Sequence, residues 1–269
     1  MMELRVIGCT GSMSGPASAA SSYLVRAYGH DPLRGRDRWW NIVLDMGPGS
    51  FGGLWRHIDP RDLDAVLFSH CHADHIGDVI SLHVHRRWGP AQGLPPILLV
   101  GPAGLEQRVR QIDGVDEAED YSGEFRFATF VDAHSFAVGP LTITPARGWH
   151  SVDSFGVRID GPGAKGQVSL FYTGDTDECD SIVEGARGVD LLLCEAGFMA
   201  TDEVRGIHLD GARAGRVASR ADVTSLLLTH IQPWNDPQQV CAEARTTWTG
   251  PLGVVRTDAI YEVGVGFSA

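Results

Sequence analysis

Residues 69–75, with the sequence SHCHADH, place three histidines, a cysteine and an aspartate within one short segment. Histidines two positions apart on an extended backbone point to the same side, and a following turn directs Asp74 and His75 toward a second point. Neutral imidazole and carboxylate groups are ligands that zinc favours, and catalytic zinc sites keep one position open for water. The segment therefore predicts a catalytic metal site, and one such loop can serve two ions. A lone histidine at a strand end would instead be expected on the surface.

Three more potential ligands lie immediately after apolar runs of strand length farther along the chain. They are His150 in ARGWHS, Asp175 in FYTGDTD and His230 in LLLTHIQP. Side chains at the ends of different strands can converge on one rim of a sheet, where loops carry active sites. Each residue alone is a weak indication, because an aspartate next to Gly174 is also typical of a turn. Together with the first cluster, they complete two coordination sets.

These ligands need a sheet scaffold, and apolar, β-branched runs of strand length recur along the chain. Strands are predicted at 3–8, 22–27, 41–45, 65–69, 96–100, 141–145, 154–159, 168–173, 189–195 and 223–229. Helices are predicted at 52–58, 74–88, 102–112, 177–187, 208–221 and 236–248. Strands run consecutively early on and alternate with helices later, which indicates two sheets with helices outside both. Exposed loops are predicted at 30–40 and 161–166, which are rich in glycine, proline and charge.

Composition limits the classes of protein to which this chain can belong. Its 269 residues, 43% of them hydrophobic, can bury a full core, and one domain over residues 1–269 is predicted. No apolar run approaches the roughly 18 residues that span a bilayer, and no signal peptide is evident, so we expect a cytoplasmic protein that does not associate with membranes. Five scattered cysteines without a CxxC pair fit a reducing compartment. The formal charge of −12 disfavours stable binding of nucleic acid.

The order in which the motifs occur is also informative. HCHADH is followed by His150, by TGDT around Asp175 and by LTH with His230, while GCTGS lies at 8–12 and LDMGPG at 44–49. This order resembles the metallo-β-lactamase superfamily over nearly the whole chain. The resemblance implies an α+β fold, the four-layer αβ/βα metallo-β-lactamase sandwich, in which two mixed β-sheets are flanked by helices and carry a dinuclear metal site.

The resemblance also assigns metal ligands. It implies one ion held by His70, His72 and His150, another held by Asp74, His75 and His230, and Asp175 with a hydroxide bridging the two. Two divalent ions are expected, zinc first, with manganese or iron as alternatives. Cys71 lies between two ligands, so on an extended backbone its side chain points away from them and is expected in the core.

The C-terminal motifs resemble one branch of this superfamily. CEAGF at 194–198, IHLDGARAGRVASRADV at 207–223 and LLLTHIQPW at 226–234 are similar to the phosphodiesterase branch that includes ribonuclease Z. The resemblance implies that Glu195 supports a catalytic His208 at the start of a helix, and that Asp74 orients the nucleophile. A carboxylate on one imidazole nitrogen fixes the tautomer and raises the pKa, which suits a proton donor. Without this resemblance, His208 would be taken as a helix N-terminal residue with no role.

Two features bear on the substrate. Ribonuclease Z carries a long arm that grips precursor tRNA, generally between the positions of His150 and Asp175, and residues 151–174 leave no room for it. A closer resemblance, through GCTGS, SHCHADH, ARGVDLLLCEA and LLLTHIQPW, is to an actinobacterial group that includes a cyclic-nucleotide phosphodiesterase. The expected activity is therefore hydrolysis of a small phosphodiester, specifically a 3′,5′-cyclic nucleotide, by the metal-bridging hydroxide.

Other functions are compatible with the same residues. The same scaffold can hydrolyse a lactone, a thioester or a β-lactam, and a ribonuclease Z-like tRNA 3′-processing enzyme is a further alternative. A non-catalytic metal-binding domain would lack ligands, whereas all seven are present. Analogy with this branch suggests a homodimer. Trp149 and Trp234 lie near predicted ligands, where they could wall the pocket or stack on a base. His83 and His85 lie on a predicted helix, where residues two apart face different directions and cannot share an ion.

Overall fold

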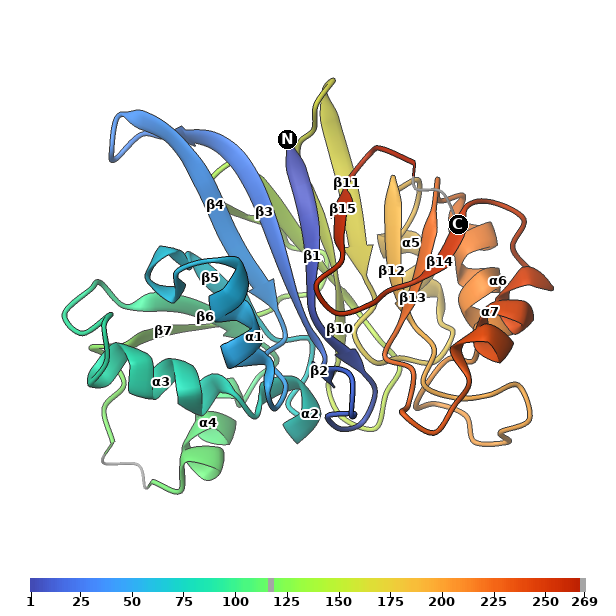
Figure 1. Cartoon of the computed structure of the whole chain (residues 1–269), viewed down its shortest axis with the longest axis horizontal. Coiled ribbons are helices and arrows are strands. Elements are labelled where there is room, and N and C mark those ends of the chain that lie inside the picture. Colours follow the sequence, from blue (N-terminus) through green and yellow to red (C-terminus); the bar gives the residue numbers. More distant parts are fainter. Residues whose placement is uncertain (116–118, 267–269) are drawn as a thin grey trace.

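Two mixed β-sheets lie face to face with helices on both outer sides in the computed structural model, which describes residues 1–115 and 119–266 (Figure 1). Among these residues, the first sheet has eight strands in the order β15-β1-β3-β4-β5-β6-β7, with β2 paired to β1. The strands β4, β5, β6 and β7 run parallel to one another. Strand β3 is antiparallel to both of the strands beside it, β1 and β4. The strands are β1 (Met2–Thr10), β2 (Ala19–Ala20), β3 (Ser22–Asp31), β4 (Arg36–Leu44), β5 (Ala65–Leu67), β6 (Ile97–Gly101), β7 (Phe125–Thr129) and β15 (Ile260–Glu262).

The second sheet has seven strands in the order β14-β13-β12-β11-β10-β9-β8 within the same described ranges. An antiparallel half, from β8 to β11, continues into a parallel half, from β11 to β14. The strands are β8 (Phe136–Val138), β9 (Leu141–Arg147), β10 (Phe155–Pro162), β11 (Gln167–Tyr172), β12 (Leu191–Glu195), β13 (Leu226–Thr229) and β14 (Leu252–Val254). The parallel half directs the carboxyl ends of its four strands toward one rim of the sandwich.

Helices complete the outer layers (Figure 1). Those of the first sheet are α1 (Ser50–His57), α3 (Val79–Arg87) and α4 (Leu105–Asp113), with α2 (Ala73–Ile76) at the rim and a short 3-10 helix, η1 (Pro60–Asp62), before β5. Those of the second sheet are α5 (Asp180–Gly185), α6 (Gly211–Ala221) and α7 (Pro237–Arg245). The sequence of α6 explains its place: Asp210 caps its first turn, and Ala214, Val217, Ala218 and Ala221 form one buried stripe.

The main core lies between the two sheets. Leu4, Tyr23 and Ile42 of the first sheet and Val157 and Leu170 of the second belong to one cluster of buried side chains. Each sheet also has one cluster of buried side chains between it and its own helices. Burying an aliphatic side chain of this size contributes roughly 1.5–3 kcal/mol, so these three layers of contact hold the two sheets and their helices together.

The expected fold is confirmed, and the differences are local. The predicted helix at 74–88 is divided into α2 and α3, because the backbone N–H of Asp78 donates to Met46 and its carboxylate accepts from Phe51. The predicted helix at 208–221 begins at Gly211 rather than at His208, because Asp210 acts as its cap. The short strands β2, β7, β8, β14 and β15 were not predicted. Each has few residues, and its alternation of apolar and polar side chains is too brief to be recognised.

The prediction of a loop over 30–40 is wrong except at residues 32–35, which form a turn, whereas the predicted exposure holds for residues 32–37. Strands β3 and β4 extend into a projecting hairpin, in which His30 pairs with Asp37 and Asp31 pairs with Arg36 in register. Opposite charges placed across two strands stabilise such a ribbon, so the charged composition that indicated a loop belongs to a hairpin. The loop at 161–166 is shorter than predicted, because β10 continues to Pro162 and pairs there with Gln167.

Candidate metal centre

The potential ligands converge at one rim of the sandwich, where strands from both sheets end. The SHCHADH segment leaves β5 and enters α2, while the other ligands follow β9, β11 and β13. Among the described residues, acidic and histidine side chains form three compact groups there, each with its ligand atoms within 4.8 Å of one another. They are His70 with His72 and His150; Asp74 with His75, Asp175 and His230; and Asp175 with Glu195 and His208.

The first group presents three imidazole nitrogens to one point. Nδ1 of His72 lies 3.1 Å from Nε2 of His70 and 3.1 Å from Nε2 of His150. Nδ1 of His150 lies 2.7 Å from the carbonyl oxygen of Ile207, so it donates there and leaves Nε2 free as a ligand. Burial, and then the neighbouring His75, hold the pKa of His70 well below its usual range. A neutral imidazole is the form that binds a metal.

The second group is built around a buried carboxylate. Oδ2 of Asp175 lies 3.2 Å from Nε2 of His75 and 3.3 Å from Nε2 of His230, while Nε2 of His75 lies 3.3 Å from Oδ2 of Asp74. The same Asp175 oxygen is 3.7 Å from Nε2 of His70, so this carboxylate reaches both groups. Burial alone would raise the pKa of Asp175, but His230, His75 and His70 outweigh it and hold that pKa well below its usual range.

These side chains fit a pair of divalent ions. Nε2 of His75 and Oδ1 of Asp175 are both buried and have no hydrogen-bond partner among the residues that the structure describes. A buried polar atom without a partner costs about 1–3 kcal/mol, and a cation between these atoms would remove that cost. The donor set of imidazoles and carboxylates suits zinc, and it also suits manganese or iron.

Asp45 orients this centre, a role that no motif in the sequence indicates. It lies just after β4 with φ of 56°, a backbone conformation that is uncommon outside glycine. Its buried carboxylate accepts from the backbone N–H of Ser69 at 2.7 Å, the Ser69 hydroxyl at 2.8 Å and the Tyr172 hydroxyl at 2.7 Å. Nδ1 of His75 lies 2.7 Å away, so it donates to Asp45 and turns Nε2 toward the ion site.

We expect Asp45→Asn to weaken zinc binding by about 10–100-fold, because the amide no longer fixes the His75 tautomer. Competition against a chromophoric zinc chelator measures this affinity. Asp160→Asn, which changes a carboxylate paired with Arg158 on β10, is the matched control and should leave zinc affinity unchanged. Equal zinc affinity in Asp45→Asn and the original chain would mean that Asp45 serves only the packing of the rim.

The conformation of His230 depends on Gly11, the second glycine of GCTGS. The φ of His230 is 55°, and Nδ1 of His230 lies 2.9 Å from the Ser21 hydroxyl. A Cβ atom at Gly11 would lie 2.2 Å from the carbonyl oxygen of His230, so only glycine fits there. Nε2 of His230 also accepts a long hydrogen bond, 3.3 Å, from the backbone N–H of Ser12. The opening motif therefore shapes one side of the centre.

His208 and Glu195 form a separate pair beside the two ligand groups. Nδ1 of His208 lies 2.9 Å from Oε1 of Glu195, whose oxygens also accept from the backbone N–H groups of Thr176 and Gly197. Because this carboxylate already has three donors, it is better suited to orient His208 than to bind an ion. Burial would lower the pKa of His208, but attraction to Glu195 outweighs it and raises this pKa to about 9. The His208 ring lies 5.3 Å from the His150 ring and 5.4 Å from the His230 ring.

A buried ion pair joins the loops that carry Asp175 and His208. Nε of Arg213 donates to Asp210 at 2.8 Å, and its Nη1 donates to Asp177. The other oxygen of Asp177 accepts from the backbone N–H of Gly206 at 2.7 Å. Arg213 is 4% exposed, so its charge is compensated by these carboxylates rather than by water.

We expect Arg213→Met to lower the free energy of unfolding by about 3–5 kcal/mol, because it leaves two buried carboxylates without their cation. Urea denaturation followed by tryptophan fluorescence measures the loss. Arg216→Met, on the same helix, removes an exposed pair with Glu178 and should cost less than about 1 kcal/mol. Similar losses in both variants would contradict the structural role given to Arg213.

The remaining sequence candidates lie around or away from the centre. Trp149 and Trp234 are 51% and 65% exposed, and the Trp149 ring covers Gly206, where a Cβ would lie 3.1 Å from it. Cys71 is half-buried and packs against the helix-covered core of the first sheet, and burial raises the pKa of its thiol to about 11. His83 and His85 are buried in α3 and belong to none of the three ligand groups found among the described residues.

Comparison with known proteins gives the family. Residues 40–231 match the family described as "Beta-lactamase superfamily domain". The uncharacterized protein Rv1339 of Mycobacterium tuberculosis is 40% identical over 265 residues, which cover 97% of this chain and 92% of that protein. The probable metallo-hydrolase YhfI of Bacillus subtilis is 27% identical over 263 residues, which cover 97% of this chain and 100% of that protein.

Two further comparisons agree with these. The crystal structure of YhfI from Bacillus subtilis superposes with a TM-score of 0.82 at 26% identity and covers 97% of this chain and 98% of that one. The ribonuclease Z of Methanopyrus kandleri is 26% identical over 246 residues, which cover 81% of this chain and 86% of that protein. The chain therefore belongs to the metallo-β-lactamase superfamily and is a metallo-hydrolase of that fold. Within the described ranges, none of the helices has the length and apolar character needed to cross a membrane.

Proposed function

We propose that this protein is a phosphodiesterase that binds two divalent ions, with zinc as the expected metal. Its proposed substrate is a small phosphodiester, specifically a 3′,5′-cyclic nucleotide. The observation that carries the proposal is the Glu195–His208 pair, which lies beside two complete ligand groups. A hydrolase that cleaves only acyl groups on this scaffold need not use a proton donor at the position of His208. The similarity to a protein named ribonuclease Z supports chemistry at a phosphodiester.

The ligand groups define which residues would hold the ions. His70, His72 and His150 would bind one ion, Asp74, His75 and His230 would bind the other, and Asp175 would contact both. When bound, two divalent ions activate a water molecule at neutral pH and offset the charge that develops on phosphoryl oxygens. The protein supplies the geometry through the fixed tautomers of His75 and His150.

The protein side chains carry the proton transfers. Asp74, whose side chain is 16% exposed, lies at the open side of the second group and would accept a hydrogen bond from the attacking water. Nε2 of His208 is the nitrogen that Glu195 leaves free, and in the protonated ring it donates to the oxygen of the departing alcohol. Glu195 is a positioning residue, because it fixes the His208 tautomer and supports its positive charge.

The surroundings favour a small substrate. Strands β10 and β11 occupy most of the chain between His150 and Asp175, so this described stretch holds no long arm for gripping tRNA. Trp149 and Trp234 are exposed and lie within four residues of His150 and His230 along the chain, and a tryptophan ring can stack on a nucleotide base. We also propose that residues 1–269 form one domain, since β15 pairs with β1 and so joins distant parts of the chain. The proposed location of this domain is the cytoplasm.

The test is a direct assay of the purified protein loaded with zinc and, separately, with manganese. Cleavage of 3′,5′-cyclic AMP is followed by chromatography beside bis-p-nitrophenyl phosphate, a homoserine lactone and the β-lactam nitrocefin. We expect both diesters to be cut and the acyl substrates to be spared. If two ions are bound but neither diester is cleaved, the proposal fails, and cleavage of an acyl substrate would then identify the alternative hydrolase.

A further inference from the structure

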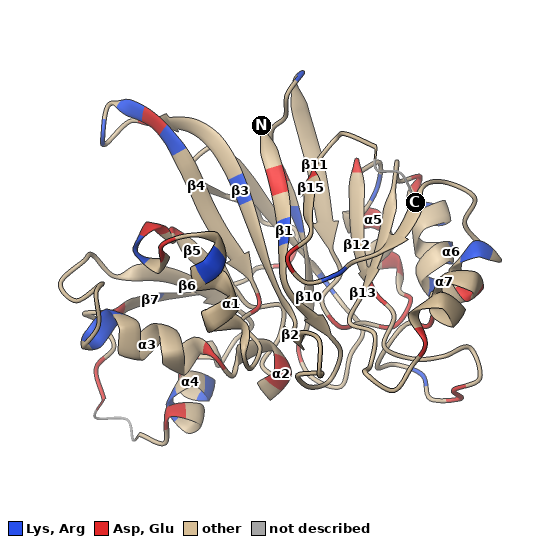
Figure 2. Ribbon diagram, viewed as in Figure 1, with Lys and Arg blue, Asp and Glu red and all other residues tan. Residues whose placement is uncertain are grey.

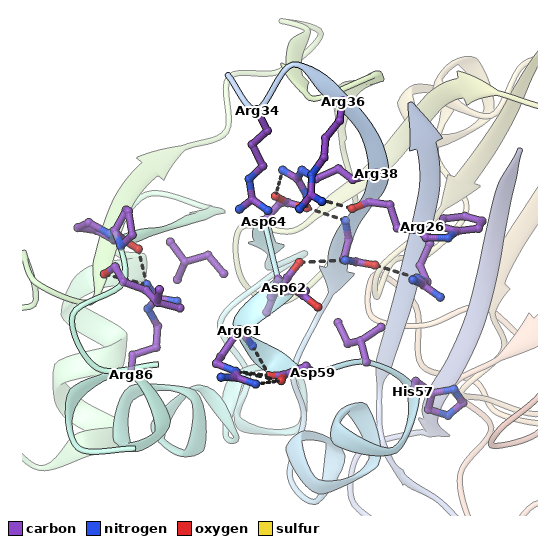
Figure 3. Close-up of a pocket in the computed structure, with 18 residues that line it drawn as sticks. Arg26, Arg34, Arg36, Arg38, His57, Asp59, Arg61, Asp62, Asp64 and Arg86 are labelled. Carbon is purple, nitrogen blue, oxygen red and sulfur yellow. Dashed lines mark hydrogen bonds and ion pairs between the residues drawn. The ribbon is translucent and has the colours of Figure 1, made fainter. Parts of the chain in front are cut away.

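Figure 3 shows a pocket of about 500 Å³. It lies at the end of the first sheet opposite the proposed metal centre. It is lined by the β3–β4 hairpin, including residues next to its turn, by the segment from His57 to Asp64, by Arg86 of α3 and by the segment before β6. Asp64 and Ile97 mark the amino ends of the parallel strands β5 and β6, whereas the SHCHADH segment follows the carboxyl end of β5. None of the proposed metal ligands lines this pocket.

The pocket is positively charged in a protein whose formal net charge is −12. Its lining includes six arginines and three aspartates, which leave a formal charge of +3 when His57 is neutral. Figure 2 shows the arginines of the hairpin as blue segments on β4 and its turn. The arginines are Arg26, Arg34, Arg36, Arg38, Arg61 and Arg86, and the aspartates are Asp59, Asp62 and Asp64.

Two of the arginines are already neutralised within the chain. Arg38 donates to Asp64 through both terminal nitrogens and to Asp31 through Nε, and Arg61 pairs with Asp59. The guanidinium of Arg38 also lies 3.7 Å from the centre of the Trp40 ring. These contacts fix the walls of the pocket and leave its excess charge on the other arginines.

The remaining arginines lack a full counter-charge. Arg36 has no ion pair among the residues described, and Arg34 reaches Asp31 only at 3.5 Å. The buried Arg86 donates to three backbone carbonyls rather than to a carboxylate, and burial lowers its pKa. Arg26 shares Glu3 with Arg5, so two cations meet one carboxylate. An anion in the pocket would balance these charges at short range, where attraction is strongest.

The other walls are apolar. Ile58, Leu63, Leu94, Pro95 and Ile97 line the pocket together with Trp39. A volume of this size is typical of sites for small organic molecules, in which apolar walls are combined with a few polar anchors. Guanidinium groups match the geometry of phosphate oxygens better than other side chains do. The lining therefore suits a ligand with both phosphate groups and an organic part.

We propose that this arginine pocket is a second binding site, distinct from the metal centre, for a small organic phosphate that carries at least two negative charges. Arg34 and Arg36 would contact the phosphate from the hairpin, Arg86 would face it from α3, and Asp62 would oppose it. Asp62 has no ion pair among the described residues, so its charge weakens the field of the pocket. The proposal does not depend on the activity of the metal centre.

The experiment is equilibrium dialysis of the zinc-loaded protein with ADP as the probe, beside AMP, adenosine and inorganic pyrophosphate. Binding is expected to be saturable below about 1 mM, to follow the order ADP, AMP, adenosine, and to weaken with salt. The double variant Arg34→Gln/Arg36→Gln should lose at least about tenfold in affinity for ADP. Asp62→Asn should gain severalfold, because it removes a repulsive charge without changing shape.

The control variant Arg126→Gln/Lys165→Gln lowers the net charge equally at exposed positions outside the pocket, and its affinity for ADP should match that of the original chain. Diester hydrolysis in the Arg34→Gln/Arg36→Gln variant reports separately on the metal centre and should not change. The proposal is overturned if ADP does not bind, if adenosine binds as well as ADP, or if the pocket variants and the control bind ADP equally. Metal-dependent ADP binding that ignores the pocket variants would place the ligand at the metal centre.

Discussion

The His208→Ala variant should keep both ions and lose phosphodiester hydrolysis by about 10²–10⁴-fold, which is the range that a positioned general acid contributes. The reason is geometric: Nδ1 of His208 is held by Glu195, and the ring lies beside both ligand groups. Measured rates with bis-p-nitrophenyl phosphate and 3′,5′-cyclic AMP test this directly. The loss should be smaller for the better leaving group, because p-nitrophenolate departs without needing a proton.

His134→Ala is the matched control, since His134 is exposed on the loop before β8 and its ring hydrogen-bonds, among the described residues, to the carbonyl oxygen of Asp132 in its own segment. It should retain full activity. Metal content, determined by mass spectrometry, should be the same in both variants and in the original chain. If His208→Ala loses zinc along with activity, His208 is a ligand rather than a proton donor. An unchanged rate would contradict any catalytic role for it.

Removing the ions should abolish hydrolysis and destabilise the fold. At a free zinc concentration of about 1,000 times the dissociation constant, each ion that binds only the native state contributes about 4 kcal/mol. For a chain of this size, each such contribution corresponds to a rise in Tm of roughly 10 °C. Differential scanning calorimetry with EDTA, and then with excess zinc, measures the effect. Asp175→Ala should lose most of this rise, because Asp175 contacts both ligand groups.

Asp153→Ala provides the comparison for that experiment. Asp153 is an exposed aspartate between β9 and β10 that pairs with Arg147, so its removal should leave the zinc-dependent rise in Tm intact. A zinc-dependent rise of equal size in Asp175→Ala would show that the ions bind elsewhere. A stable chain whose Tm ignores zinc altogether would contradict the proposed metal centre.

Local patterns in the sequence predict much of the fold and the proposed ligands. SHCHADH is a compact cluster, and His150, Asp175 and His230 each follow an apolar run, so their convergence can be expected from the sequence alone. Asp45 cannot be recognised in the same way. An aspartate before Met-Gly-Pro is typical of a turn, and the contacts of Asp45 with Ser69, His75 and Tyr172 span up to 127 positions. Such pairings are set by the packing of two sheets.

The hairpin and the arginine pocket show the same limit. The charges of 30–40 indicate solvent exposure, but nothing local reveals that Arg38 meets Asp64 beyond the next helix, or that Arg86 lies near the hairpin. His208 illustrates the opposite case. Helix α6 begins at Gly211, three residues after the start predicted at His208. The pairing of His208 with Glu195 depends instead on strand β12, which ends at Glu195 as the sequence indicates.

Each of the two proposed ion-binding groups, His70 with His72 and His150 and Asp74 with His75, Asp175 and His230, draws on both sheets, and this has a consequence for the dynamics of the rim. His70 and His75 follow the first sheet, whereas His150, Asp175 and His230 follow strands of the second. Bound ions would therefore cross-link the two halves of the sandwich, much as a pair of disulfides would. Separation of the sheets at this end would first have to break coordination bonds. Amide hydrogen exchange in the rim loops should therefore slow sharply when zinc is added, whereas the exchange rate in the projecting β3–β4 hairpin should not depend on zinc.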